Sequence, residues 1–180
     1  MPNYPSIFND VIGPVMRGPS SSHCAASLRI ARICRDLMDE QIKDIVIEFD
    51  PNGSLATTHK SQGSDMGLFG GFLGWEAYDE RLPDSEKHLA TAGINYTITI
   101  CPLEEKHPNT YKIRLSNEKE TKELIAISTG GGMIEVINID GNKVSMAGDY
   151  YETLIYCTDA DNIIKYLKST ITYDEIIFHK

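Results

Sequence analysis

Three serines followed by a histidine, at residues 20–23, are the strongest candidate for chemistry in this sequence. They follow Gly18 and Pro19 and precede apolar residues with helical spacing, so the serines stand at a helix start, where backbone N–H groups have no helical partner. Such N–H groups and hydroxyls can bind a carboxylate or a phosphate, and His23 can donate to that anion or carry a proton. A well-capped helix with a surface histidine would explain the same residues without a ligand.

A second polar stretch, residues 57–65, leads into a glycine-rich segment that offers another helix start. A polar loop with a cap explains this stretch equally well when it is taken alone. Residues 107–110 have the composition of an ordinary turn entering a strand. Three glycines at 130–132 indicate either a hairpin or a place where another backbone or a ligand approaches closely.

The cysteines argue against a metal centre held by this chain alone. The four are Cys24, Cys34, Cys101 and Cys157, scattered at wide spacings with no CxxC pair. Zinc and iron–sulfur sites usually take at least two ligands from one short loop. Residues 1–9 show no basic start followed by an apolar stretch, so we expect no secretory signal, reduced thiols and a cytoplasmic location.

The composition is that of a globular protein with an acidic balance. The chain has 180 residues, of which 41% are hydrophobic and 24% charged, which suits one domain, or one domain with a small appendage. A formal charge of −9 disfavours nucleic acid and anionic membranes as main partners, because both require a basic surface. The longest nearly apolar run, residues 66–75, is shorter than the ~20 residues that a membrane span needs.

The elements that must position these residues indicate the α+β class, with helices mostly in the first half. Apolar spacing predicts helices at 20–38, 64–73 and 84–92. The glycines of the second helix lower its intrinsic propensity by about 1 kcal/mol each, so we expect close packing against another backbone. Strands are expected at 45–49, 53–58, 96–100, 111–115, 124–128, 134–139 and 143–146, with a hairpin turn at 140–141.

The end of the chain differs from the rest. A strand at 154–157, a helix at 162–168 and a strand at 175–178 predict a small βαβ-like tail. A domain boundary is expected near residue 148, which gives domains at 1–148 and 149–180.

Taken together, the candidate segments resemble the beta subunit, or beta domain, of iron–sulfur-dependent L-serine dehydratases. The likeness covers residues 5–148 in order, and its specific part is the serine-histidine segment at 18–23. The other segments that carry it are 6–8, 12–16, 29–32, 53–54, Lys60 with Gly63 and Asp65, 70–71, 78–81, 107–110 and 127–132.

The resemblance implies an enzyme divided between two chains. An alpha-type subunit would carry the cysteines that hold a [4Fe–4S] cluster, and this chain would not ligate it. In the family the exposed iron acts as a Lewis acid on the substrate, a base removes the α-proton, water leaves, and the enamine hydrolyses to pyruvate and ammonia. The implied partners are this alpha chain and a small hydroxy amino acid or hydroxy acid, in a homo- or hetero-oligomer. The implied fold is also seen in the allosteric substrate-binding domain of some phosphoglycerate dehydrogenases.

The segments that carry the resemblance also contain the candidate site residues, although His59 stands where the family often has an aromatic residue. His23 and His59 are the catalytic candidates, although the proton carrier could also belong to the other chain. The substrate-binding candidates are Ser20, Ser21, Ser22, Cys24, Lys60, Gln62, Asp65, His107 and Asn109. No metal ligand is assigned to this chain.

Three departures from the family pattern bear on function. Cys24 stands where the family usually has threonine, and Gln62 stands where it usually has a histidine. A glutamine forms hydrogen bonds but exchanges no protons near neutral pH. The options are therefore L-serine as substrate, another small hydroxy acid, an altered proton relay, or a non-catalytic small-molecule-binding regulatory module of the same fold. Family beta chains often end in a full ACT domain, whereas residues 149–180 would make a degenerate half unit, for which we predict no amino-acid-responsive site.

Overall fold

The computed structural model describes residues 15–39, 41–148 and 150–179. The chain divides into two compact units, Met1–Ala147 and Gly148–Lys180. The family-like segments at 6–8 and 12–14, and residues 1–9, where no secretory signal is expected, lie outside the described residues.

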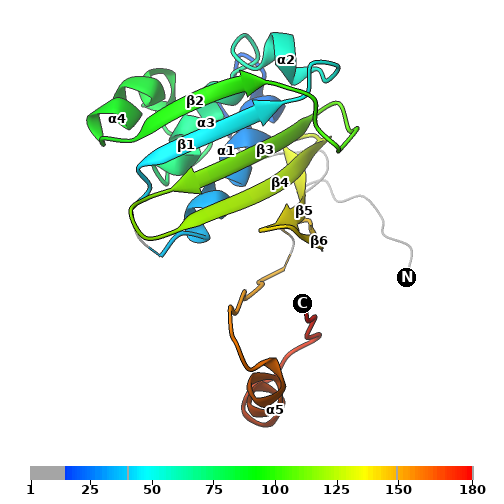
Figure 1. Cartoon of the computed structure of the whole chain (residues 1–180). Coiled ribbons are helices and arrows are strands. Elements are labelled where there is room, and N and C mark those ends of the chain that lie inside the picture. Colours follow the sequence, from blue (N-terminus) through cyan, green and yellow to red (C-terminus); the bar gives the residue numbers. More distant parts are fainter. Residues whose placement is uncertain (1–14, 40, 149, 180) are drawn as a thin grey trace. The chain divides into compact units, whose positions relative to one another are not determined.

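The first unit is built on a six-stranded mixed sheet with the strand order β2-β1-β3-β4-β5-β6 (Figure 1). The strands are β1 (Asp44–Phe49), β2 (Asn95–Ile100), β3 (Thr110–Ser116), β4 (Thr121–Gly130), β5 (Met133–Ile139) and β6 (Asn142–Met146). Only the β1–β2 pair is parallel. The predicted α+β class is confirmed, as is the 140–141 turn, where Asp140 and Gly141 both have positive φ, as a two-residue hairpin of this twist requires.

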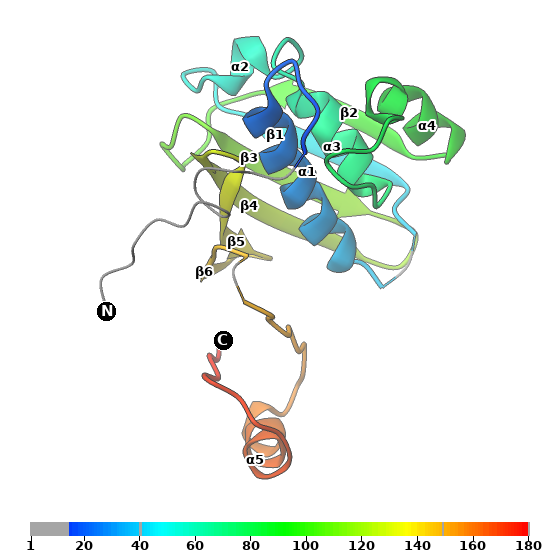
Figure 2. The same cartoon turned by 180° about the vertical axis from the view of Figure 1, so that it is seen from behind.

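Helices cover one face of this sheet, and Figure 2 shows α1 and α3 side by side upon it. The helical elements of this unit are α1 (Ser21–Asp36), α2 (Leu55–Thr58), α3 (Ser64–Phe72), the short 3₁₀ turn η2 (Leu82–Asp84) and α4 (Ser85–Thr91). The core lies between the sheet and α1 and α3, because alternate residues of β1 and β3 point to the helices and are buried. The predicted helices at 20–38, 64–73 and 84–92 are confirmed.

The glycines of α3 allow it to lie directly on α1. A Cβ added at Gly67 would lie 2.2 Å from the carbonyl oxygen of Cys24, and one at Gly71 would lie 2.4 Å from that of Leu28. The expected close backbone packing is thus confirmed. Because Gly67 faces Cys24 and Gly71 faces Leu28, the two helices run in the same direction, and their N-terminal ends meet at one end of the unit.

The prediction of a strand at 53–58 is wrong, since these residues form a turn and α2. A strand there would need a free neighbour, but both edges of β1 are already occupied by β2 and β3. The chain instead pairs locally: the N–H of His59 donates to the carbonyl of Leu55 at 3.0 Å, and that of Ser54 to the carbonyl of Pro108 at 2.8 Å. Buried Leu55 holds the turn against the core.

The prediction of a βαβ-like tail is also wrong. In the second unit, α5 (Ala160–Thr170) is the only helix or strand among the described residues, and Asp159 caps it by accepting from the N–H of Asn162 at 3.2 Å. The segments 154–157 and 175–178 form no strands, because a β-strand needs a partner for its backbone groups. Among the described residues, no helix of either unit has the length and apolar character needed to cross a membrane.

Candidate functional site

The candidate residues lie at the end of the first unit where α1 and α3 begin. At this end β1 stops at Phe49 and β3 starts at Thr110, because the two strands are antiparallel neighbours. Gly132, in the turn between β4 and β5, also lies here, and a Cβ added to it would lie 4.0 Å from the carbonyl oxygen of Ser22. The topology therefore brings five segments to one end of the unit, called here the rim: the starts of α1 and α3, the end of β1, the start of β3 and the β4–β5 turn.

Ser20 and His23 form a pair at the start of α1. The Ser20 Oγ lies 2.8 Å from Nδ1 of His23, and both side chains are half-buried. Ser20 is the N-cap residue, but its hydroxyl does not cap the helix backbone, so the predicted capping role of that hydroxyl is wrong. The first turn of α1 carries no acidic residue, and Ser21 is exposed upon it. This helix start therefore keeps the features that suit an anion.

His59 and Asp65 form a second pair where α2 passes into α3. The Oδ1 of Asp65 lies 2.7 Å from Nδ1 of His59, and the two side chains are 15% and 21% exposed. A carboxylate accepts, so Nδ1 carries the hydrogen of this bond and Nε2 is the nitrogen that remains to exchange a proton. The His59 ring also packs against Phe49, with ring centroids 5.2 Å apart.

Gly63 makes this second pair possible. Its φ of +81° turns the chain back between the two helices, in a conformation that favours glycine. As a result, the N–H groups of Ser64 and Asp65 donate to the carbonyl of His59 at 2.8 and 3.3 Å. A Cβ at Gly63 would also lie 3.0 Å from Cδ of Pro19, so this turn packs against the loop that leads into α1.

A backbone hydrogen bond joins the two pairs. The N–H of Ser20 donates to the carbonyl of Gln62 at 3.2 Å. The side chain of Gln62 also contacts Thr58, whose hydroxyl lies 3.2 Å from Oε1 of Gln62. The same hydroxyl lies 2.6 Å from the carbonyl oxygen of Ser54. Gln62 therefore lies between the two histidine-containing segments as a hydrogen-bonding residue.

The same line of contacts reaches residues 107–109. The Ser54 hydroxyl donates to Oδ1 of Asn109, and the backbone N–H of Asn109 donates to Nδ1 of His107 at 3.2 Å. His107 lines a small cavity of about 90 Å³ beside Asp50. Hydrogen bonds from the N–H groups of Leu103 and Asn52 lower the pKa of Asp50, so this carboxylate is charged at neutral pH.

Comparison with known proteins decides the family. The chain is 38% identical over 156 residues to the probable L-serine dehydratase beta chain of Bacillus subtilis (strain 168), a match that covers 87% of this chain and 70% of the relative. It is 36% identical over 168 residues to the L-serine dehydratase beta chain of Peptoniphilus asaccharolyticus, covering 92% of this chain and 75% of the relative. This chain belongs to the L-serine dehydratase beta-chain family. No protein-family model matches it.

One predicted substrate-binding residue of this beta chain does not fit the role. Cys24 is wholly buried, in a cluster with Leu28, Trp75 and Leu82. Burial raises the pKa of its thiol to about 11. Cys24 faces the α3 side of the first turn of α1, so it packs in the core while Ser21 faces solvent. Lys60, in contrast, is exposed at the end of α2.

Tyr111 packs on the buried side of the segment that holds the His59–Asp65 pair. Its ring is buried against Phe49, with centroids 5.6 Å apart, and its hydroxyl donates to the Ser64 Oγ at 3.3 Å. Burial raises the pKa of Tyr111 to about 12, so it remains a neutral hydrogen-bond donor. Periodicity marks Tyr111 only as a strand residue, and nothing in the sequence signals its contact with Ser64.

The described residues of this beta chain do not make a cluster site. Among residues 15–39, 41–148 and 150–179, no three His, Cys, Asp or Glu side chains are grouped so that they could hold a metal ion. Cys24 and Cys34 are core residues, whereas Cys157 is exposed in the second unit. Cys101 is half-buried, so the four thiols differ in their surroundings and lie in separate parts of the chain.

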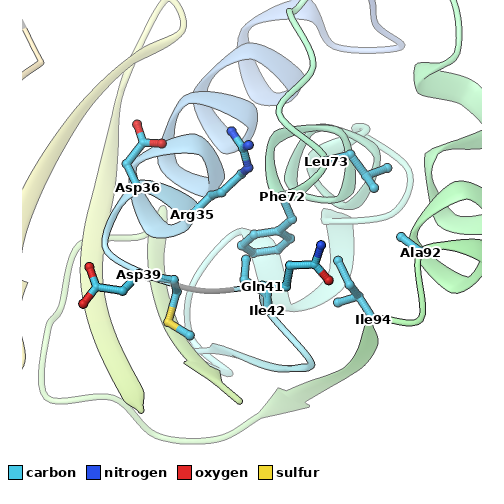
Figure 3. Close-up of a pocket in the computed structure, with 10 residues that line it drawn as sticks. Arg35, Asp36, Asp39, Gln41, Ile42, Phe72, Leu73, Ala92 and Ile94 are labelled. Carbon is cyan, nitrogen blue, oxygen red and sulfur yellow. The ribbon is translucent and has the colours of Figure 1, made fainter. Parts of the chain in front are cut away.

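The larger hollow lies at the opposite end of the helix pair (Figure 3). It encloses about 790 Å³ and is lined where α1 and α3 end, by residues that include Arg35, Gln41, Phe72 and Ile94. None of the predicted site residues lines it. The larger of the two hollows therefore lies away from the Ser20–His23 and His59–Asp65 pairs.

Proposed function

We propose that this chain is the beta subunit of a two-chain, cytoplasmic L-serine dehydratase whose alpha-type partner carries a [4Fe–4S] cluster. The observation that carries the proposal is the hydrogen bond from Ser20 to Gln62, which joins the Ser20–His23 and His59–Asp65 pairs at the parallel starts of α1 and α3. Membership of the L-serine dehydratase beta-chain family supports the assignment. The beta subunit would complete an active site shared with the alpha chain.

The start of α1 would bind the substrate carboxylate. Its backbone N–H groups are not capped by the Ser20 hydroxyl, and no acidic side chain lies in the first turn to repel an anion. The positive end of the helix dipole favours a negative group there. Exposed Ser21 would add a hydroxyl hydrogen bond, and half-buried His23, oriented by Ser20, would add a second donor.

His59 would carry the proton. Asp65 holds Nδ1–H of the ring and thereby leaves Nε2 as the atom that accepts or returns a proton. Asp65 would then orient His59 and would not contact the substrate directly. Gln62 would orient the two segments, since its amide cannot exchange protons near neutral pH.

A second candidate is a non-catalytic regulatory module that binds the same small hydroxy acids. The specific observation in its favour is Gln62, which replaces a protonatable side chain of the family pattern and instead makes hydrogen bonds within the fold. In that case the Ser20–His23 segment would bind a ligand and His59 would not take part in turnover.

Reconstitution with the alpha-type chain of the same organism tests the proposal. The isolated chain should bind no iron and should not deaminate L-serine, whereas the co-expressed complex should be brown, oxygen-sensitive and active. Serine deamination by the isolated chain would contradict the division of the site between two chains.

Two pairs of variants distinguish catalysis from regulation. Ser21→Ala and His23→Ala should reduce turnover of the complex while association with the alpha chain stays intact, measured by size-exclusion chromatography and a pyruvate assay. Ser145→Ala on β6 and His179→Ala in the second unit are the matched controls, because neither residue belongs to the segments that form the rim. Loss of ligand binding by calorimetry with full turnover retained would favour the regulatory module.

A further inference from the structure

We propose that residues 75–81, called here the Trp75 loop, position Ser20 and His23 by holding the chain on both sides of them. This inference rests on the proposed function of the Ser20–His23 segment. The residues of the loop act on these side chains through Arg17 and through the first turns of α1.

The Trp75 loop is fixed by one carboxylate and one guanidinium. Asp79 accepts three hydrogen bonds from Arg81: from its backbone N–H at 2.9 Å, from Nε at 3.0 Å and from Nη2 at 2.7 Å. The guanidinium of Arg81 also lies over the Trp75 ring, 4.3 Å from its centroid. Hydrogen bonding to Arg81 lowers the pKa of Asp79 to about 2, and the charge of Arg17 adds to this effect, so the pair is ionised throughout the neutral range.

The loop holds the chain before Ser20. The backbone N–H of Arg17 donates to the carbonyl of Ala77 at 2.9 Å. The guanidinium of Arg17 lies 3.6 Å from the carboxylate of Glu80. Arg17 is three residues from Ser20, so a displacement of the Ala77 carbonyl would pass directly to the start of α1.

The loop also holds the chain after His23. Trp75 is 9% exposed and packs in one cluster with Cys24 and Leu28, on the first two turns of α1. Glu76 adds an ion pair with Arg32, about one turn beyond Leu28 on the same helix. Ser20 and His23 therefore lie between two anchored points, and the bond from Ser20 to Gln62 holds them from the α3 side.

Such anchoring matters for chemistry more than for folding. The charged side chains of the loop's ion pairs are mostly exposed, except that of Asp79 at 18%, and exposed pairs contribute little to stability. A misplacement of about 1 Å in a reacting group, however, can cost about 10²-fold in rate. The Asp79–Arg81 fork is therefore a positioning device, and Asp79, Arg81 and Trp75 are positioning residues.

Amide hydrogen exchange on the isolated full-length chain tests the positioning itself. Arg81→Lys keeps the charge but loses the two-pronged contact and the planar stack on Trp75, and Asp79→Asn weakens the same fork. Both should accelerate exchange of the Arg17 and Ser20 amides about 10-fold while β3 amides are unchanged. Lys87→Met on α4 is the matched control, because it removes an exposed ion pair with Asp84. It should leave the exchange of the Arg17 and Ser20 amides unchanged. Unchanged exchange at Arg17 and Ser20, or acceleration spread over the whole chain, would overturn the proposal.

Turnover of the reconstituted complex then tests the consequence. Arg81→Lys should lower kcat about 10-fold with a smaller change in KM, and it should cause no further loss in a His23→Ala background, because the two changes remove the same function. An additive loss would overturn the claim that the loop acts through this segment. If His23→Ala leaves turnover intact, the proposed catalytic role of that segment fails, and the exchange rates of Arg17 and Ser20 alone decide whether the loop positions it.

Discussion

The two ends of the α1–α3 helix pair differ both in the size of their hollows and in the chemistry of the side chains around them. The C-terminal end has the larger hollow, about 790 Å³, whereas the N-terminal end has a cavity of about 90 Å³ beside His107. At the N-terminal end, however, the polar side chains are held by one another, as in the Ser20–His23 and His59–Asp65 pairs. In Figure 3, Arg35 and Gln41 instead border a hollow lined by Phe72 and neighbouring apolar residues.

The direction of the two helices explains why the two ends differ in their affinity for an anion. Backbone N–H groups and the positive end of the dipole lie at the start of a helix, and carbonyl groups with the negative end lie at its finish. Because α1 and α3 run in the same direction, both dipoles have their positive ends at the rim and their negative ends at the large hollow. The start of α1 has no acidic residue in its first turn, whereas the start of α3 already holds Asp65. The proposed substrate carboxylate is therefore expected at the smaller, hydrogen-bonded end, at the start of α1.

The largest effect is expected from Asp65→Asn. An asparagine at this position no longer requires Nδ1–H of His59 to face it, so the ring loses its defined tautomer, and kcat of the reconstituted complex should fall about 10²- to 10³-fold. Steady-state pyruvate formation measures the change. Asp84→Asn, at an exposed carboxylate before α4, is the control and should keep normal turnover. Wild-type kcat for Asp65→Asn would remove His59 from the mechanism.

The helix pair itself can be broken by one methyl group. In Gly67→Ala the new Cβ would overlap the Cys24 carbonyl at 2.2 Å and the Ser27 hydroxyl at 2.1 Å, so α3 must move away from α1, and the free energy of unfolding should fall by about 3 kcal/mol. Urea denaturation of the isolated chain measures this. Gly93→Ala is the matched control: Gly93 has φ +75° but no atom within 4 Å of an added Cβ, so only backbone strain of about 1 kcal/mol is expected. Equal losses would show that packing is not the reason for Gly67.

Thiol reactivity separates the core from the rim at the start of α1. Cys24 has no exposed surface, and burial raises the pKa of its thiol to about 11. At pH 8 almost none of it is thiolate, so it should react only after unfolding. Cys157 is exposed and should react within the folded chain. Timed alkylation with mass-spectrometric mapping distinguishes them. Labelling of Cys24 as fast as Cys157 would return Cys24 to the substrate site.

The smallest effect is expected at the large hollow. Gln41→Ala removes a polar side chain from its lining, far from the helix starts, and kcat/KM of the complex should stay within about two-fold of the wild type. The same assay used for Asp65→Asn gives a direct comparison of the two ends. A loss as large as that of Asp65→Asn would mean that the reaction depends on the C-terminal end.

Local pattern accounts for much of the agreement between sequence and structure. The spacing of apolar residues predicts α1, and alternation with β-branched residues predicts β1 and β3, because one face of each element must be buried. The glycines of α3 are signals of close packing for the same reason: their low helix propensity needs a compensating contact. The serine-histidine segment is the specific part of the family resemblance, although serines alone are common at a helix start.

The exceptions depend on contacts between distant segments. Thr57 and Thr58 favour a strand locally, but β1 has no free edge for it, so α2 forms. The apolar segments at 154–157 and 175–178 have strand-like composition, yet the second unit does not pair them. In both cases the availability of a neighbouring strand decides the structure, and sequence spacing does not carry that information.

The sequence by itself determined the family, the α+β class and the residue types at the site, because these follow from motif and periodicity. Only the tertiary structure decided which residues act together. Gly63 turns the chain so that Asp65 faces His59, and the packing of α3 on α1 buries Cys24 one residue after His23. The physical reason is that backbone reversal and helix packing set the direction of each side chain, and both depend on residues far from the motif.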